Sequence, residues 1–270
     1  MSKDTVYVII PARAASTRLP NKPLVEIAGT PMLKRVIGIA KSVTPSCEVI
    51  VATEAEAIRE AVLSWGLCDC EITSADCRTG SDRVGEVLRK RGITEGIVIN
   101  LQGDAPITPP WVVQGMVDEM KRDPESVCVT PAVELTEPQL AALVESKRLS
   151  PSSGTTVVTD LNRNALYFSK TVLPFSREKK RETPVLRHIG LYGYRAEFLL
   201  KYLTFPATPL ESAEKLEQLR ILEHGYKIRV VKVDYRGRTH ASVDAPSDVI
   251  EVERIIAEEG ELPVATAAKP

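Results

Sequence analysis

The sequence of 270 residues lacks the patterns that mark several common classes of protein. It contains neither the G-x-G-x-x-G pattern of dinucleotide-binding sheets nor the G-x-x-x-x-G-K-[ST] pattern of P-loop kinases. No apolar run approaches the ~20 residues that span a membrane, and no secretory leader precedes the first strand-like run. A dinucleotide-dependent oxidoreductase and a P-loop kinase are therefore disfavoured, and we expect a cytoplasmic location.

An excess of charge of one sign and paired cysteines are also missing. The 35 basic and 36 acidic side chains give a formal net charge of −1, so we expect neither nucleic acid nor a membrane as a partner. The five cysteines form no C-x-x-C pair and no zinc-ligand spacing. We expect most of them to be reduced packing residues, although Cys77 lies in a loop that we assign to a nucleotide site.

What the sequence does contain is an alternation of apolar runs with helical patterns, and 43% apolar residues are enough for one large core. The strand-like runs lie at residues 5–10, 47–52 and 96–101. The helical patterns between and after them lie at residues 31–42, 54–64, 81–91 and 109–122. This order predicts an α/β fold with a doubly wound, mostly parallel sheet.

The pattern changes after residue 126. Strand-like runs with shorter separations, which suggest antiparallel or mixed strands, lie at residues 127–134, 155–159, 164–168 and 185–194. The earlier rhythm returns with a helix, a strand and a helix at residues 210–223, 227–233 and 246–259. We predict a single domain over residues 1–259, in which residues 127–205 form a smaller mixed-sheet lobe, and a disordered tail at residues 260–270.

A loop with three cations directly follows the first strand-like run. Arg13, Arg18 and Lys22 stand where the ligand of a parallel sheet would lie, at the carboxyl end of a strand. Small residues at positions 12 and 14–16 leave main-chain N–H groups open to phosphate oxygens, while the cations neutralise the phosphate charge. A solvated basic loop is the alternative, and the small residues favour a polyphosphate site.

Two aspartates in distant parts of the chain can supply carboxylate ligands. Asp104 ends a Gln-Gly-Asp turn after the run at 96–101, and Asp244 precedes the last predicted helix. Mg²⁺ prefers oxygen ligands and usually takes one or two carboxylates together with substrate phosphates. Each aspartate has another explanation that the residues alone leave open, a turn for Asp104 and a helix cap for Asp244.

Three further segments can supply polar contacts. Ser81 can cap a helix while Gly80 exposes the backbone. Strand alternation over residues 187–194 places four residues on one face, namely His188, Gly190, Tyr192 and Tyr194. Helical spacing places three polar side chains on one side, namely Glu214, Glu217 and Gln218. A structural histidine and a solvated helix face remain open as alternatives.

Taken in order, these segments resemble the 3-deoxy-manno-octulosonate (Kdo) cytidylyltransferases, also called CMP-Kdo synthetases, over about residues 5–256. The motifs that carry the resemblance are Pro-Ala-Arg-Ala-Ala-Ser-Thr-Arg-Leu-Pro-Asn-Lys-Pro-Leu at 11–24, Asn-Leu-Gln-Gly-Asp at 100–104, Ala-Leu-Tyr-Phe-Ser at 165–169, Arg-His-Ile-Gly-Leu-Tyr-Gly-Tyr at 187–194, Leu-Glu-Gln-Leu-Arg at 216–220 and Val-Asp-Ala-Pro at 243–246. The resemblance implies a Rossmann-like nucleotidyltransferase fold, whose smaller lobe serves the sugar and dimerisation. It also implies an enzyme that couples CTP to Kdo, giving CMP-Kdo for lipopolysaccharide or capsule precursors, with Mg²⁺ as cofactor and a homodimer as assembly.

The resemblance also implies roles for single residues. The implied metal ligands are Asp104 and Asp244, and these two form the catalytic set together with Arg13 and Lys22. The residues implied for the nucleotide are Ala12, Arg13, Arg18, Lys22, Gly80, Ser81, Arg83 and Gln102. The residues implied for the sugar are Ser169, Lys170, His188, Gly190, Tyr192, Glu217 and Gln218.

Four positions depart from the pattern of the Kdo enzymes and leave the identity of the sugar open. Ala105 stands in place of an acidic residue, Thr156 in place of a lysine, Lys170 in place of an arginine and Ser242 in place of a glycine. The alternative acceptors are 8-amino-Kdo and other octulosonic or nonulosonic acids. A non-catalytic nucleotide-binding protein is a further alternative, which the retention of both aspartates disfavours.

Overall fold

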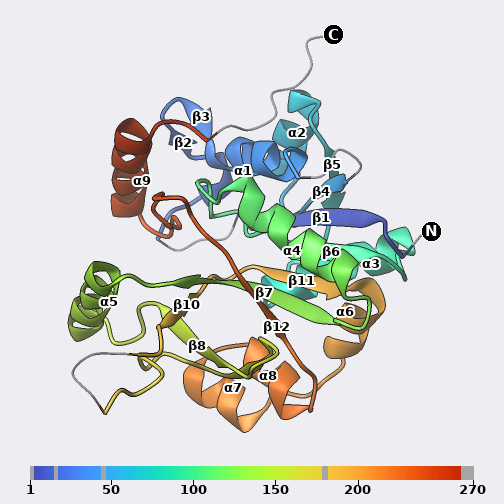
Figure 1. Ribbon diagram of the computed structural model, residues 1–270. Helices are drawn as coiled ribbons and strands as arrows, with labels where there is room; N and C mark the ends of the chain where they lie inside the picture. Colours follow the sequence, from blue (N-terminus) through green and yellow to red (C-terminus); the bar gives the residue numbers. More distant parts are fainter. Residues whose placement is uncertain (1–2, 15–17, 44–46, 178–181, 263–270) are drawn as a thin grey trace.

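One continuous sheet runs through the computed structural model, which describes residues 3–14, 18–43, 47–177 and 182–262 (Figure 1). In this part of the chain the sheet has ten strands. Their order is β5 (Asp69–Ile72), β4 (Glu48–Thr53), β1 (Val6–Pro11), β6 (Ile97–Asn100), β11 (Tyr192–Arg195), β7 (Cys128–Glu134), β10 (Leu186–His188), β8 (Thr155–Thr159) and β9 (Ala165–Ser169), and β12 (Arg229–Lys232) pairs with β7.

The first four strands in this order, β5, β4, β1 and β6, run parallel to one another. β1 lies between β4 and β6, and its residues Val6–Ile10 are at most 2% exposed. A strand that is covered on both faces needs such a continuous apolar run, because neither row of side chains meets water. The predicted buried parallel strands are therefore confirmed.

The remaining strands make the sheet mixed, so the expectation of a mostly parallel sheet is wrong. β11 pairs antiparallel with both β6 and β7, and β10 pairs antiparallel with both β7 and β8. The parallel order ends at β11, because this strand lies between β6 and β7 and runs antiparallel to both. In addition, residues 185–194 do not form one strand. The chain leaves β10 at His188 and enters β11 at Tyr192 on the other side of β7.

Helices cover both faces of the sheet (Figure 1). They are α1 (Met32–Lys41), α2 (Glu56–Trp65), α3 (Gly80–Arg91), α4 (Pro110–Arg122), α5 (Glu137–Leu149), α6 (Ala196–Tyr202), α7 (Pro209–Glu214), α8 (Gln218–Glu223) and α9 (Pro246–Glu259). Apolar residues of α1, α2 and α4 join one core cluster, those of α3, α6 and α8 join a second, and those of α9 join a third. A short helix η1 (Lys22–Leu24) and a hairpin of β2 (Glu26–Ile27) and β3 (Thr30–Pro31) follow the first loop, and β2 packs beside α9.

Two boundaries differ from the prediction. The expected helix at 210–223 is broken into α7 and α8, because Lys215 adopts a left-handed backbone with φ of 55°. The expected disordered tail is wrong for residues 260–262, since Glu261 pairs with Arg35 at 2.7 Å and Leu262 packs against the core. Residues 263–270 of that tail lie outside the described residues.

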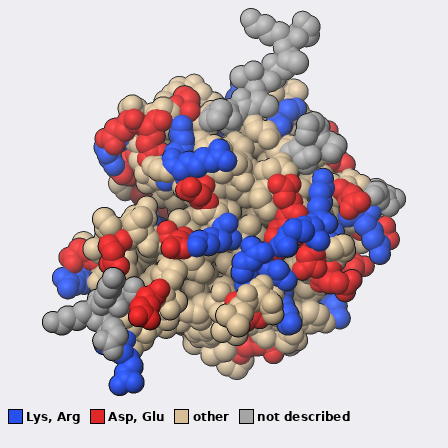
Figure 2. Space-filling model, in the orientation of Figure 1, with Lys and Arg blue, Asp and Glu red and all other residues tan. Residues whose placement is uncertain are grey.

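The surface charge is mixed. Figure 2 shows basic and acidic side chains intermingled over one face of the molecule, as the formal net charge of −1 allows. Among the described helices, none has both the length and the hydropathy of a membrane span.

The contact between β11 and its neighbours generates a stability prediction. A methyl group at Gly193 would lie 2.7 Å from Cγ2 of Val129 and 3.0 Å from Cδ1 of Ile99, inside the core. We expect Gly193→Ala to lower the free energy of unfolding by about 1–3 kcal/mol through overpacking, measured by urea denaturation. Gly115→Ala is the control, because its nearest neighbour lies at 4.0 Å, and an equal loss in both variants would contradict the prediction.

Candidate functional site

A pocket of about 240 Å³ opens at the carboxyl ends of β1 and β6. The predicted residues that line it are Ala12, Arg13, Lys22, Gly80, Arg83, Gln102 and Asp104. Cys77, which we placed in a nucleotide loop, also lines this pocket. The structure therefore brings together three segments that are far apart in the sequence. Residues 15 and 16 of the first loop lie outside the described part of the chain.

Glycine allows the loops around this pocket to approach each other. A Cβ atom at Gly103 would lie 2.6 Å from the carbonyl oxygen of Pro11, which is backbone and cannot swing aside. A Cβ atom at Gly80 would lie 3.2 Å from Cγ of Pro11. The end of β1, the loop after β6 and the start of α3 thus meet with little space between them, which leaves backbone groups uncovered at the pocket wall.

The Lys22 ammonium lies between the two predicted metal ligands. Its Nζ donates to Oδ2 of Asp104 at 2.8 Å and to Oδ1 of Asp244 at 3.0 Å. Lys22 is only 7% exposed, and burial alone would lower its pKa, yet the two carboxylates raise the pKa above its ordinary value. Arg18 adds a longer pairing with Asp244 at 3.6 Å. The structure therefore joins Asp104 and Asp244 in one charged cluster.

The helix-cap explanations of Ser81 and Asp244 are both wrong. The N-cap residue of α9 is Ala245, whose backbone N–H donates to the Asp248 carboxylate in the first turn at 2.9 Å. α3 is capped by Thr79, and the Ser81 hydroxyl instead donates to Oε1 of Glu217 at 2.8 Å. Both side chains are consequently used for contacts between distant segments.

The donor set around Lys22 fits a magnesium ion that is completed by its substrate. Asp104 and Asp244 offer carboxylate oxygens, the ligand type that Mg²⁺ prefers. Over the described ranges, no group of three or more His, Cys, Asp or Glu side chains could hold a metal ion. Two carboxylates are nevertheless sufficient where phosphate oxygens supply further ligands.

Arg83 lines the pocket, but its guanidinium is already engaged. It pairs with Oε2 of Glu54 at 2.9 Å, donates to the Thr73 hydroxyl, and is 4% exposed. Sequence reasoning did not identify Glu54, which directly follows β4. The signal was present, because a polar residue at the carboxyl end of a parallel strand is the same pattern that pointed to Arg13 and Asp104.

The residues predicted for the sugar lie beside α7 and α8. The Ser169 hydroxyl donates to Oε1 of Glu214 at 2.7 Å, and the Lys170 Nζ donates to the Thr155 hydroxyl at 3.0 Å. Burial lowers the pKa of Lys170. Burial also raises the pKa of the Glu217 carboxyl, although the hydrogen bond from Ser81 opposes that shift. These positions form a polar zone along the ends of β8 and β9.

Gln218 and Gly190, two further residues predicted for the sugar, differ in their surroundings. Gln218 is 2% exposed, and its Nε2 has no hydrogen-bond partner within the described residues. Gly190 lies between β10 and β11, and no heavy atom lies within 4 Å of an added Cβ.

His188 and Tyr192 belong to two strands, β10 and β11, which lie on opposite sides of β7, so the expected single strand is wrong. Their side chains still lie on one face of the sheet, as predicted, because their rings are 5.7 Å apart. Thr130 donates its one hydroxyl proton to the carbonyl of Leu191 at 2.7 Å, so the His188 Nε2, at 2.8 Å, is the donor to the Thr130 oxygen. Burial lowers the pKa of His188 to about 3. Its ring packs 4.9 Å from Phe168 and 5.7 Å from Tyr192, as a neutral core histidine would.

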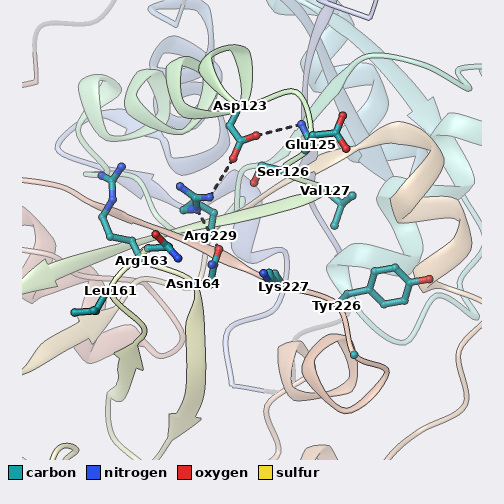
Figure 3. Close-up of a pocket in the computed structure, with 12 residues that line it drawn as sticks. Asp123, Glu125, Ser126, Val127, Leu161, Arg163, Asn164, Tyr226, Lys227 and Arg229 are labelled. Carbon is teal, nitrogen blue, oxygen red and sulfur yellow. Dashed lines mark hydrogen bonds and ion pairs between the residues drawn. The ribbon is translucent and has the colours of Figure 1, made fainter.

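A larger hollow of about 690 Å³ lies elsewhere, between the start of β7 and the start of β12. Figure 3 shows Asp123 and Arg229 pointing toward each other in it, and their side chains pair at 3.1 Å. Arg229 also contacts Glu119 at 3.3 Å. Because its arginine is neutralised by carboxylates, and because none of the predicted site residues line it, this hollow is the weaker candidate.

Known proteins resemble the chain over most of its length. A family model described as "Cytidylyltransferase" matches residues 7–228. The 3-deoxy-manno-octulosonate cytidylyltransferase of Maricaulis maris (strain MCS10) is 46% identical over 258 residues, which cover 96% of this chain and 99% of that protein. The protein of the same name from Zea mays is 38% identical over 250 residues, which cover 92% of this chain and 80% of that protein.

Solved structures agree with the fold. A structure of CMP:2-keto-3-deoxy-manno-octonic acid synthetase complexed with CTP is 34% identical and superposes with a TM-score of 0.84, covering 95% of this chain and all of the other (100%). The 4-diphosphocytidyl-2C-methyl-D-erythritol synthase of Anaerococcus prevotii DSM 20548 shares the fold at 14% identity and a TM-score of 0.61, with coverage of 95% and 100%.

The buried His188 generates a pH prediction. Its folded-state pKa of about 3 lies below the ordinary value of 6.5, so the unfolded chain binds more protons between these values and stability falls as the pH falls from 6.5 toward 3. At pH 5 the loss relative to pH 7.5 amounts to about 2 kcal/mol. We expect His188→Gln to remove this part of the pH dependence of the unfolding free energy, measured with urea. The part that comes from His240 remains, because burial lowers the pKa of that residue to about 4. Identical pH dependence in both proteins would contradict the burial of a neutral His188.

Proposed function

The chain belongs to the 3-deoxy-manno-octulosonate cytidylyltransferase family, and from this premise we propose that its pocket couples CTP to Kdo, giving CMP-Kdo and pyrophosphate. The observation that carries the proposal is the cluster of Lys22 with Asp104 and Asp244, which stands beside Arg13 at the ends of β1 and β6. It combines carboxylates for a cation with ammonium and guanidinium groups for phosphates, as nucleotidyl transfer requires.

The reaction forms a bond between a sugar hydroxyl oxygen and the α-phosphorus of CTP, while the bond from that phosphorus to the pyrophosphate oxygen breaks. Such a transfer needs charge neutralisation and in-line positioning rather than a covalent nucleophile. Arg13 and Lys22 stabilise the negative charge that grows on the leaving pyrophosphate, with Arg18 as support. The burial of Lys22 in the wall of the pocket supports this role, since a buried ammonium acts in a low dielectric.

Asp104 and Asp244 would hold Mg²⁺, which neutralises phosphate charge and lowers the pKa of the attacking hydroxyl when it is bound. Lys22 keeps the two carboxylates near each other and compensates their charge. Gly80 and Ala12 expose backbone to the nucleotide, and Gln102 offers an amide to cytosine or ribose. Ser81 and Arg83 serve the nucleotide indirectly, through Glu217 and Glu54.

The acceptor lies along the polar zone at the ends of β8 and β9. Lys170 and Ser169 bind the sugar carboxylate, and Glu217 and Gln218 bind hydroxyl groups. The buried Nε2 of Gln218, which has no hydrogen-bond partner among the described residues, supports this assignment. Gly190 leaves space for the sugar ring, whereas His188 and Tyr192 contribute shape from the core.

A homodimer that uses residues 127–205 is part of the proposal. β9 is the last strand in the order of the sheet. Large apolar side chains on or near it are exposed, namely Leu161 (104%), Leu166 (62%) and Phe175 (83%). Apolar side chains beside an unpaired strand edge favour self-association.

The test is pyrophosphate release with CTP and Mg²⁺ against a panel of acceptors that contains Kdo, 8-amino-Kdo and a sialic acid, with ATP, GTP and UTP as nucleotide controls. We expect release with CTP and Kdo. Release with CTP and only another acid would keep the reaction and replace the acceptor. Binding of CTP without release from any acceptor would instead favour a nucleotide-binding protein.

The two aspartates give a sharper prediction. We expect Asp104→Asn and Asp244→Asn each to lower turnover by about 10²–10³-fold, since an amide cannot supply the negative charge that a cation needs, with folding checked by circular dichroism. Asp118→Asn is the matched control, because Asp118 is exposed on α4, where its carboxylate accepts from the Gln114 amide at 2.7 Å. An active Asp104→Asn enzyme would refute the assignment of the metal ligand.

A further inference from the structure

Glu54 touches two walls of the nucleotide pocket at once. It directly follows β4, and its Oε1 accepts from the backbone N–H of Ala14 at 2.8 Å. Its Oε2 pairs with the Arg83 guanidinium at 2.9 Å. One carboxylate therefore joins the loop that carries Arg13 to the helix α3.

The ion pair between Glu54 and Arg83 is largely shielded from water. The Arg83 side chain is 5% exposed and the Glu54 side chain 15%. Within the described chain, Glu54 supplies the one carboxylate that pairs with Arg83, and the other contact of the guanidinium is the neutral hydroxyl of Thr73. Loss of the Glu54 charge would leave a buried cation without compensation, which costs far more than the loss of an exposed pair.

β4 also fixes the residue before Arg13. The N–H of Ala12 donates to the carbonyl of Ala52 on β4 at 2.8 Å. Arg13 is thus held on both sides, at Ala12 by the backbone of β4 and at Ala14 by the Glu54 carboxylate. The backbone bond at Ala12 belongs to any chain with this sheet, but the bond at Ala14 depends on the side chain at position 54.

We propose that Glu54 is a positioning residue that, together with Arg83, orients the loop of residues 12–14 so that Arg13 and the adjacent backbone meet the phosphates of the nucleotide. This inference rests on the proposed function and adds to it a residue that does not touch the substrate. Arg83 then acts through Glu54, because its own guanidinium is directed at that carboxylate.

The test compares the wild-type protein with Glu54→Gln, Arg83→Gln and the double variant. Calorimetry gives the affinity for CTP in the presence of Mg²⁺, and kinetics give the KM values for CTP and for the acceptor. We expect each single variant to raise the Kd and KM for CTP about tenfold and to leave the KM for the acceptor within twofold. Because both residues act through one contact, the double variant should weaken CTP binding no more than either single variant.

Glu71→Gln is the matched control, since it weakens an ion pair of 3.2 Å that Glu71, on the neighbouring strand β5, makes with Arg91, and Glu71 does not line the nucleotide pocket. Wild-type protein that fails to bind CTP would overturn the proposed function. Wild-type protein that binds CTP, with Glu54→Gln binding equally well, would overturn the role of Glu54 alone. If a single variant does not fold, the double variant is compared with Glu71→Gln instead, because the double variant leaves no uncompensated charge. Unchanged CTP affinity in the double variant also overturns the inference.

Discussion

The shared ammonium of Lys22 is the interaction on which the rest of the site depends. Asp104 and Asp244 come from loops that are 140 residues apart in the numbering, and in the absence of a cation their negative charges would repel each other. Lys22 removes that repulsion while it is itself almost fully buried. A backbone hydrogen bond from the N–H of Val243 to the carbonyl of Asp104, at 2.9 Å, keeps the two loops in register beneath it. Electrostatics and backbone pairing thus specify the same geometry.

The part of this site that sequence reasoning predicted is the part that local patterns encode. A continuous β-branched run followed by cations identifies β1 and its loop, and a Gly-Asp turn after a second run identifies Asp104. Both rest on the rule that ligands gather at the carboxyl ends of parallel strands. Glu54 also lies at the carboxyl end of a parallel strand, β4. The sequence does not single it out, because an acidic segment at this point equally suits the first turn of α2.

The errors come from information that no local pattern holds. Residues 187–194 read as one alternating strand, yet β7 lies between the two halves, and strand order is a property of the whole sheet. The alternation itself correctly separates the two faces, since Tyr192 and Tyr194 join one core cluster while Ile189 and Leu191 join another. Similarly, the left-handed backbone at Lys215 is not encoded by a glycine, so the break between α7 and α8 has no sequence signal.

The hydrogen bond between Ser81 and Glu217 connects α3, at the wall of the nucleotide pocket, with the start of α8, where we propose that the acceptor binds. Two binding events that share such a contact are thermodynamically linked. If an occupied nucleotide pocket holds Ser81 in place, it also holds Glu217, and the acceptor then meets a carboxylate that is already oriented. By linkage, the acceptor must strengthen nucleotide binding by the same factor. Cooperation between the two substrates can therefore be encoded in one buried hydroxyl group rather than in a moving domain.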